Sequence, residues 1–107
     1  MLFRLRADVS DDDRRALVDA WSTALKNIPA IRRARVGRRV RIGRSYESLT
    51  RLDLPYAAVL EFDDVDALGS YLDHPAHEAM AARLFAAIED ALIYDFEVTA
   101  TPEGKDF

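Results

Sequence analysis

The sequence predicts one α+β domain, in which a four-stranded antiparallel sheet carries helices on one face. Short segments with an apolar residue at every second position predict strands, and longer segments with apolar residues every three or four positions predict helices. These segments follow one another in the order β-α-β-β-α-α-β, and 107 residues are enough for a single domain. One strand is apolar on both faces, which predicts a second layer over the sheet.

The first two elements are a short strand and a long helix. Residues 1–7 alternate between apolar and basic side chains, as a half-buried strand does. Ser10 stands before three aspartates, which favour the positive end of a helix dipole, so Ser10 is the expected N-cap. The helix should end before Pro29, because the residue preceding a proline avoids the α region. Trp21 lies on the apolar stripe of this helix and fits either the core or the lining of a pocket.

An arginine-rich strand is predicted over residues 32–43. At a period of two, its apolar residues share one face and most of its arginines share the other. Arg38, next to Gly37, breaks this alternation and predicts a β-bulge. The net charge of −4 and the lack of aromatic residues between the arginines argue against nucleic acid as the partner. Residues 44–54 are expected to form a polar loop, or a flap folded over the sheet.

The strand predicted over residues 55–62 indicates a homodimer. Its even-numbered residues from Tyr56 to Phe62 are apolar, and so are Ala57 and Val59 on the other face. A strand that is apolar on both faces is buried on both. Because one helical layer covers only one face of a small sheet, a second copy of the chain should cover the other by packing sheet against sheet.

Two helices and a strand complete the predicted fold. Residues 63–71 open with acidic residues and predict a short helix. Pro75 suits the first position of a longer helix, which should run to about Asp90 with His74 as its N-cap. The last strand is expected over residues 91–98. The resulting order of elements is that of a ferredoxin-like α+β unit.

Three polar residues near the end of the chain form the candidate site. His77 lies on the apolar stripe of its helix, so its ring should face the interior, where burial and neighbouring charges shift a pKa. Tyr71 lies just upstream. Asp95 interrupts an otherwise apolar run, and a buried carboxylate needs a partner, for which His77 is the obvious candidate. These residues are either an acid–base site or a hydrogen-bonded core network.

Composition excludes several other classes of protein. The chain contains no cysteine, which excludes disulfides and thiolate chemistry and is typical of a cytoplasmic protein. No apolar run approaches the roughly 20 residues of a membrane span, and the first residues are too charged for a signal peptide. A metal could take His74 and His77 as ligands, with Asp73 or Asp95. A capping role would turn His74 outward, which argues against this metal site.

Over residues 1–98, the sequence resembles the stress-responsive dimeric α/β-barrel (Dabb) domain. The most specific match is Tyr71-Leu72-Asp73-His74-Pro75-Ala76-His77. Weaker matches are Asn27-Ile28-Pro29-Ala30-Ile31, Val36-Gly37, Glu61-Phe62 and Tyr94-Asp95-Phe96. The resemblance implies a homodimer whose two sheets face each other as a barrel, and it leaves residues 99–107 as a polar tail.

The family includes olivetolic acid cyclase, a plant polyketide cyclase that closes a ring by intramolecular aldol condensation without a metal or organic cofactor. The resemblance matches its catalytic His to His77, its active-site Tyr to Tyr71, and the Asp bonded to that His to Asp95. The cyclase has a further pocket histidine early on its first strand, and this sequence has no equivalent.

Two functional hypotheses follow from the residues and the resemblance. In the first, His77, made more basic by Asp95, takes a proton α to a carbonyl while Tyr71 donates a hydrogen bond to the enolate. In the second, the chain is a binding or stress-associated protein without turnover, and the three residues stabilise its core. The side chains expected to line a pocket for an apolar or aromatic carbonyl compound are Leu5, Trp21, Val59, His74, Met80, Leu84 and Ile88.

Overall fold

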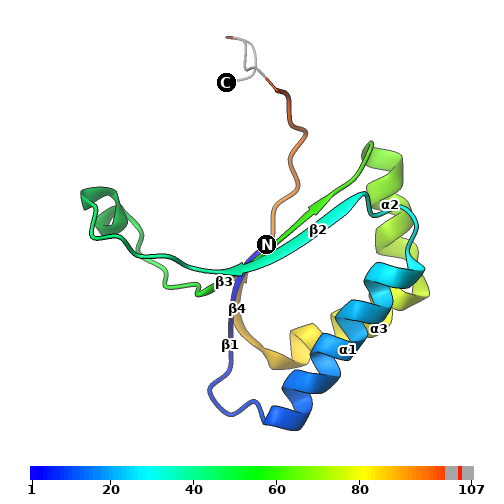
Figure 1. Ribbon diagram of the computed structural model, residues 1–107, viewed down its shortest axis with the longest axis horizontal. Helices are drawn as coiled ribbons and strands as arrows, with labels where there is room; N and C mark the ends of the chain where they lie inside the picture. The colour runs from blue at the N-terminus through cyan, green and yellow to red at the C-terminus, as the bar shows by residue number, and fades with distance from the viewer. Residues whose placement is uncertain (101–103, 105–107) are drawn as a thin grey trace.

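The structure, a computed structural model, describes residues 1–100 and residue 104. Its elements are β1 (Leu2–Leu5), α1 (Asp11–Asn27), β2 (Arg33–Arg38), the 3₁₀ helix η1 (Ser45–Leu49), β3 (Tyr56–Glu61), α2 (Val65–Asp73), α3 (Pro75–Ala87) and β4 (Ile88–Leu92). The strands form one antiparallel sheet in the order β2-β3-β1-β4, with the helices to one side (Figure 1). The predicted ferredoxin-like α+β fold is confirmed.

The helices begin and end where local chemistry requires. The Ser10 hydroxyl accepts a hydrogen bond of 3.1 Å from the Asp13 amide at the start of α1. Ile28, which precedes Pro29, has an extended backbone and ends that helix. Asp64 caps α2 in the same way, by accepting a hydrogen bond of 2.8 Å from Ala67. These caps set the residue at which each helix begins.

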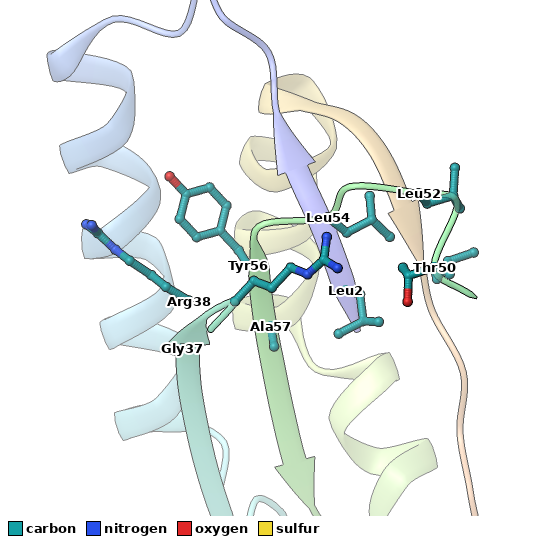
Figure 2. Close-up of a pocket in the computed structure, with 10 residues that line it drawn as sticks. Leu2, Gly37, Arg38, Thr50, Leu52, Leu54, Tyr56 and Ala57 are labelled. Atoms are coloured by element: carbon teal, nitrogen blue, oxygen red, sulfur yellow. The ribbon is translucent and has the colours of Figure 1, made fainter. Parts of the chain in front are cut away.

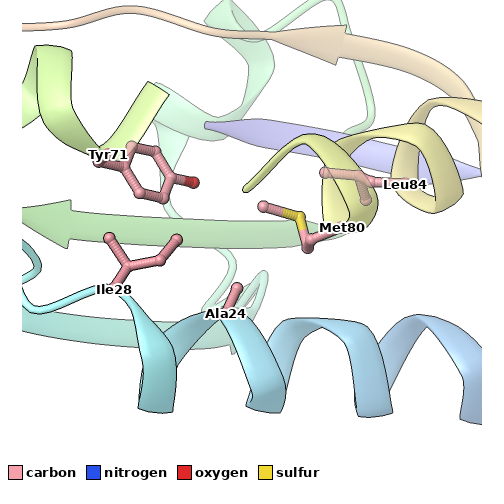
Figure 3. Packing of buried hydrophobic residues seen from close by; sticks show 5 residues of the cluster. All are labelled: Ala24, Ile28, Tyr71, Met80 and Leu84. Carbon is pink, nitrogen blue, oxygen red and sulfur yellow. The ribbon is translucent and has the colours of Figure 1, made fainter. Parts of the chain in front are cut away.

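The core lies between the helices and one face of the sheet. Figure 3 shows its central cluster, which consists of Ala24, Ile28, Tyr71, Met80 and Leu84. Phe3 and Leu60 pack against this cluster from the sheet. Since neighbouring residues of a strand point to opposite faces, Leu2 and Val59 lie on the face without helices. We call that surface the helix-free face.

The arginine-rich strand is shorter than predicted. Pairing with β3 ends at Arg38, and the chain then leaves the sheet instead of continuing as a strand to residue 43. The predicted bulge at Gly37 and Arg38 is also wrong, since the β2–β3 register runs without a shift from Arg33 to Arg38. The only shift in the described sheet falls between Arg4 and Leu5, in the β1–β4 pair. Alternation of residue types was therefore a poor guide to pairing in this strand.

The last strand begins earlier than predicted. α3 ends at Ala87 and β4 runs from Ile88 to Leu92, whereas the sequence suggested a helix to Asp90 and a strand over 91–98. Ile88 and Leu92 are four residues apart, a spacing that fits one helix face and also one strand face. Pairing with β1 decides between them. The predicted polar tail falls partly on residues 101–103 and 105–107, which lie outside the described residues.

Two segments leave the folded body. Residues 39–55, which we call the arm, connect β2 to β3, and residues 93–98, which we call the C-terminal segment, continue from β4 (Figure 1). The radius of gyration is 15.7 Å, compared with about 13 Å for a compact domain of this size. Among the described residues, no helix has the length and apolar character needed to cross a membrane.

Candidate functional site

Tyr71 and His77 are brought together by the turn between α2 and α3. Tyr71 lies near the end of α2, and Pro75 occupies the first turn of α3, so His77 follows within one helical turn. The ring centroids of Tyr71 and His77 are 4.5 Å apart in an edge-on arrangement. On its other side, Tyr71 contacts the ring of Phe62 at 5.1 Å. Local sequence therefore fixes the phenol and the imidazole against each other.

One backbone contact sets the tautomer of His77. Its Nδ1 lies 3.1 Å from the carbonyl oxygen of Leu72. A carbonyl oxygen only accepts hydrogen bonds, so Nδ1 must carry the proton. In the neutral ring, Nε2 is then unprotonated and free to act as a base. The half-buried His77 is thus oriented by the backbone of α2.

Tyr71 is held in its neutral form. Its side chain is buried, with 8% of its surface exposed. Burial, and to a lesser degree the negative charge of Asp95, raises the pKa of the Tyr71 phenol above its ordinary value. A phenol that stays protonated is a hydrogen-bond donor, which is the role expected of it beside a developing enolate.

Asp95 does not occupy the predicted place. It is exposed, and among the described residues no hydrogen bond or ion pair joins it to His77. The Leu72 carbonyl, and not a carboxylate, is the partner of Nδ1 of His77. The expectation of a buried Asp95 bonded to His77 is therefore wrong for a single copy of the chain. Asp95 still acts on the site through its charge, as the pKa of Tyr71 indicates.

His74 has a structural position. Its Nδ1 accepts a hydrogen bond of 3.0 Å from the Ala76 amide, so it caps α3 as predicted. That bond commits one of its two ring nitrogens to the backbone. Within the part of the chain that the structure describes, no three His, Cys, Asp or Glu side chains gather in a way that could hold a metal ion.

The residues predicted to line a pocket do not form one. Trp21 and Met80 lie beside Tyr71, but the space that they share has a volume of about 0 Å³ for water. Leu84 is core, and Leu5 pairs with Ile88 in the β1–β4 ladder. Placing Val59 in this pocket was wrong, because strand alternation puts it on the helix-free face.

A known family model covers almost the whole chain. The model of a family described as the stress responsive A/B barrel domain, or Dabb, matches residues 1–98. The chain belongs to the Dabb family. Among curated proteins, none matches the sequence.

Solved structures with this fold include proteins described as dimeric. A dimeric ferredoxin-like protein of unknown function from Thermobifida fusca has a TM-score of 0.62 and 26% identity, over 83% of this chain and 77% of its own. A dimeric protein of unknown function from Bacteroides fragilis has a TM-score of 0.57 and 28% identity, over 89% and 90%. A protein from Arabidopsis thaliana has a TM-score of 0.74 and 19% identity, over 95% and 94%, which shows the fold alone.

This Dabb chain has one hollow that the sequence did not predict. It has a volume of about 340 Å³ and lies on the helix-free face (Figure 2). One row of paired residues crosses the whole sheet beneath it, and this row consists of Gly37, Ala57, Leu2 and Leu92. Because glycine and alanine have small side chains, the surface of the sheet is depressed where this row crosses β2 and β3. Thr50, Leu52 and Leu54 of the arm form the wall of the hollow. Only the cross-strand register could have revealed it.

Proposed function

We propose that this Dabb chain works as a homodimer, with the helix-free faces of two copies packed against each other. Leu2 and Val59 lie on that face with 45% and 56% of their surface exposed, which is unfavourable in a free monomer. The Thermobifida and Bacteroides relatives are described as dimeric. An isologous contact buries the same apolar face of both copies at once.

The second part of the proposal is a cofactor-independent reaction on a small apolar or aromatic carbonyl compound. Nε2 of His77 takes a proton from the carbon α to a carbonyl, and the Tyr71 phenol donates a hydrogen bond to the enolate oxygen. The carbanion attacks a second carbonyl of the same molecule, and the imidazolium returns its proton to the new alkoxide. The observation that supports this most directly is the Nδ1 contact with Leu72, which leaves Nε2 as the base.

A proton-exchange experiment tests this chemistry without knowledge of the natural substrate. Acetophenone and 2-heptanone are suitable probes, since both are apolar and exchange their α-protons slowly in neutral D₂O. Wild-type protein should accelerate the exchange, and His77→Ala should remove about 10²–10⁴-fold of that acceleration. Arg83→Gln, an exposed change on the same helix, is the matched control and should leave exchange unchanged. Equal exchange rates in wild type and His77→Ala would refute the proposal.

A second function is favoured by the packing around Tyr71. Because the space beside it has about 0 Å³ for water, the Tyr71–His77 pair also fits a structural role in a binding or stress-associated protein. In that case His77→Ala should lower the free energy of unfolding and should not change the exchange rate of either probe. The two readouts therefore separate the two functions in one variant.

A further inference from the structure

The arm differs in charge from the rest of the chain. It contains four arginines and two acidic residues, so its net charge is +2, while the rest of the chain has a net charge of −6. The net charge of −4 for the whole chain therefore conceals a basic projection on an acidic body. Figure 1 shows that this projection extends away from the sheet and the helices. A basic segment that stands clear of an acidic body is placed to meet an anionic surface.

The uncompensated charges of the arm lie near η1. Arg39 and Arg41 share the single carboxylate of Asp53. Arg44 directly precedes η1, Arg51 follows it after one residue, and both are exposed. Within residues 1–100 and 104, neither Arg44 nor Arg51 forms an ion pair with an acidic side chain. These two guanidinium groups are therefore available to an external anion.

Aliphatic and aromatic side chains are exposed on the same projection. Tyr46 and Leu49 of η1 are 60% and 81% exposed, and Val40 and Ile42 are 76% and 61% exposed. The Glu47 carboxylate accepts a hydrogen bond of 2.7 Å from the Ile42 amide, which ties η1 to the stretch that carries the other two apolar side chains. Apolar side chains next to free basic groups are typical of segments that lie in the interface of an anionic membrane.

We propose that the arm attaches the protein to the surface of an anionic membrane. The apolar side chains of η1 lie among the lipid headgroups, and Arg44 and Arg51 contact lipid phosphates. Binding of this kind combines the burial of apolar surface with an attraction that grows with each basic residue near the lipid. The contact is peripheral, so it leaves the sheet and the helices as they are.

The helix-free face of a second copy matches the arm less well than an anionic membrane does. By strand alternation, that face carries three arginines and two acidic residues, which are Arg4, Arg33, Arg35, Glu61 and Asp90. It therefore has no excess of negative charge to offer a basic arm. The acidic excess of the chain lies outside this face.

A nucleic acid would match the arginines of the arm but not its apolar side chains. Proteins that bind single strands stack the bases on aromatic rings, and Tyr46 is the only aromatic residue of the arm. Contacts to a phosphate backbone need basic groups alone and leave aliphatic side chains in water. The exposed valine, isoleucine and leucine therefore favour lipid.

Cosedimentation of the full chain with vesicles tests the proposal. One set of vesicles contains equal parts of phosphatidylglycerol and phosphatidylcholine, and the other contains phosphatidylcholine alone. Wild-type protein should bind the anionic vesicles at least about tenfold more tightly than the neutral ones. Added salt should weaken this binding, because it screens exposed charges. Equal binding to both kinds of vesicle, or binding to neither, would overturn the proposal.

A pair of double variants tests whether the position of the charges matters. Arg44→Gln combined with Arg51→Gln should weaken binding to anionic vesicles by about tenfold or more. The matched control combines Arg14→Gln and Arg83→Gln, which removes two exposed arginines from α1 and α3 and changes the net charge equally. The control should bind as wild type. An equal loss in both double variants would overturn the proposal, since total charge alone would then explain the binding.

An apolar variant separates lipid from nucleic acid. Leu49→Ser should weaken binding to anionic vesicles by about fivefold, because it removes an apolar side chain that the lipid would bury. Val18→Ser changes an exposed aliphatic side chain on α1 and should have no effect. Wild-type affinity in Leu49→Ser, with tight binding of duplex DNA by the wild-type chain, would overturn the proposal in favour of a nucleic acid.

Sedimentation velocity without lipid separates the membrane from a second copy. Leu49→Ser should dimerise as wild type, because its side chain is assigned to lipid. Dimerisation that is tenfold weaker in Leu49→Ser would overturn the proposal, since the arm would then contact the partner. None of these measurements uses turnover or requires a dimer. Failure of the carbonyl chemistry at His77 or of the sheet-to-sheet dimer would therefore leave the membrane proposal standing, and the reverse also holds.

Discussion

The face of the sheet under the helices buries Ala58 to 3% exposure, whereas Val59, the next residue of the same strand, keeps 56% of its surface exposed on the other face. Both faces carry apolar residues, but only one is covered within a single chain. On the covered face, the end of α2 and the capped start of α3 position Tyr71 and His77. On the helix-free face, the arm and the C-terminal segment extend away from the body (Figure 1). One face therefore specifies the fold, and the other is the face that the proposed homodimer would cover.

The largest difference between the faces should appear in stability. Leu84→Ala removes a buried side chain from the core and should lower the free energy of unfolding by about 2–5 kcal/mol. Val59→Ala should change the stability of the isolated chain by less than about 0.5 kcal/mol, because it acts on an exposed position. Urea unfolding at two protein concentrations measures both. The Leu84→Ala loss should be the same at both, and the Val59→Ala loss should grow with concentration as the dimer forms. Equal losses at low concentration would contradict this difference.

The hollow gives a more selective test of the helix-free face. A Cβ at Gly37 would meet no atom within 4 Å, so Gly37→Val does not clash inside the chain. Valine also favours the strand conformation, so the stability of the monomer should not fall. Its side chain fills the hollow over Ala57, where a second copy should pack. Dimerisation measured by sedimentation should weaken by about tenfold. Unchanged dimerisation would show that the partner does not enter the hollow.

The same contrast explains which features could be predicted from the sequence. Ser10, His74 and Pro75 act through neighbouring residues, so their roles as caps and helix start were visible from spacing alone. The exposed second face was visible from the two apolar faces of β3. The start of β4 was not, because the spacing of Ile88 and Leu92 fits a helix as well as a strand and pairing with β1 decides.

The candidate site divides along the same line. The contact between Tyr71 and His77 depends only on the short turn that joins α2 to α3. Both residues were predicted to belong to the site. Asp95 lies beyond the end of β4, and residue spacing does not encode how a segment outside the sheet is placed. The hollow depends on the register of four strands, so no local pattern could reveal it.

The charge of Asp95 links the two regions, and its removal should be visible at Tyr71. Asp95→Asn should lower the pKa of the Tyr71 phenol, because a nearby negative charge disfavours the phenolate. The pKa should stay above its ordinary value, since burial is the larger cause. Titration of the ¹³C-labelled tyrosine ring by NMR measures the change. Glu97→Gln, at the next acidic residue of the C-terminal segment, should leave the Tyr71 pKa unchanged. An equal decrease in both variants would mean that the segment acts only through its total charge.

The smallest effect concerns the arm, which borders the helix-free face and contains a cluster of ion pairs. The Asp53 carboxylate accepts hydrogen bonds from Arg39 at 3.1 Å and Arg41 at 3.0 Å, and these hold the pKa of Asp53 below its ordinary value. A carboxyl group with a lowered folded-state pKa stabilises the fold above its unfolded value of 3.8 and loses that contribution as pH falls through the folded value.

Amides of residues 39–42 should therefore shift in NMR spectra as pH falls below about 4, the unfolded value for a carboxyl group of this kind. Asp53→Asn should produce the same shifts at neutral pH and leave the unfolding free energy nearly unchanged, because exposed ion pairs contribute little. Asp8→Asn breaks an exposed pair with Arg6 outside the arm and should leave these amides unaffected. If Asp53→Asn left the amides of residues 39–42 unaffected as well, contacts with the sheet, and not the ion pairs of Asp53, would position the arm.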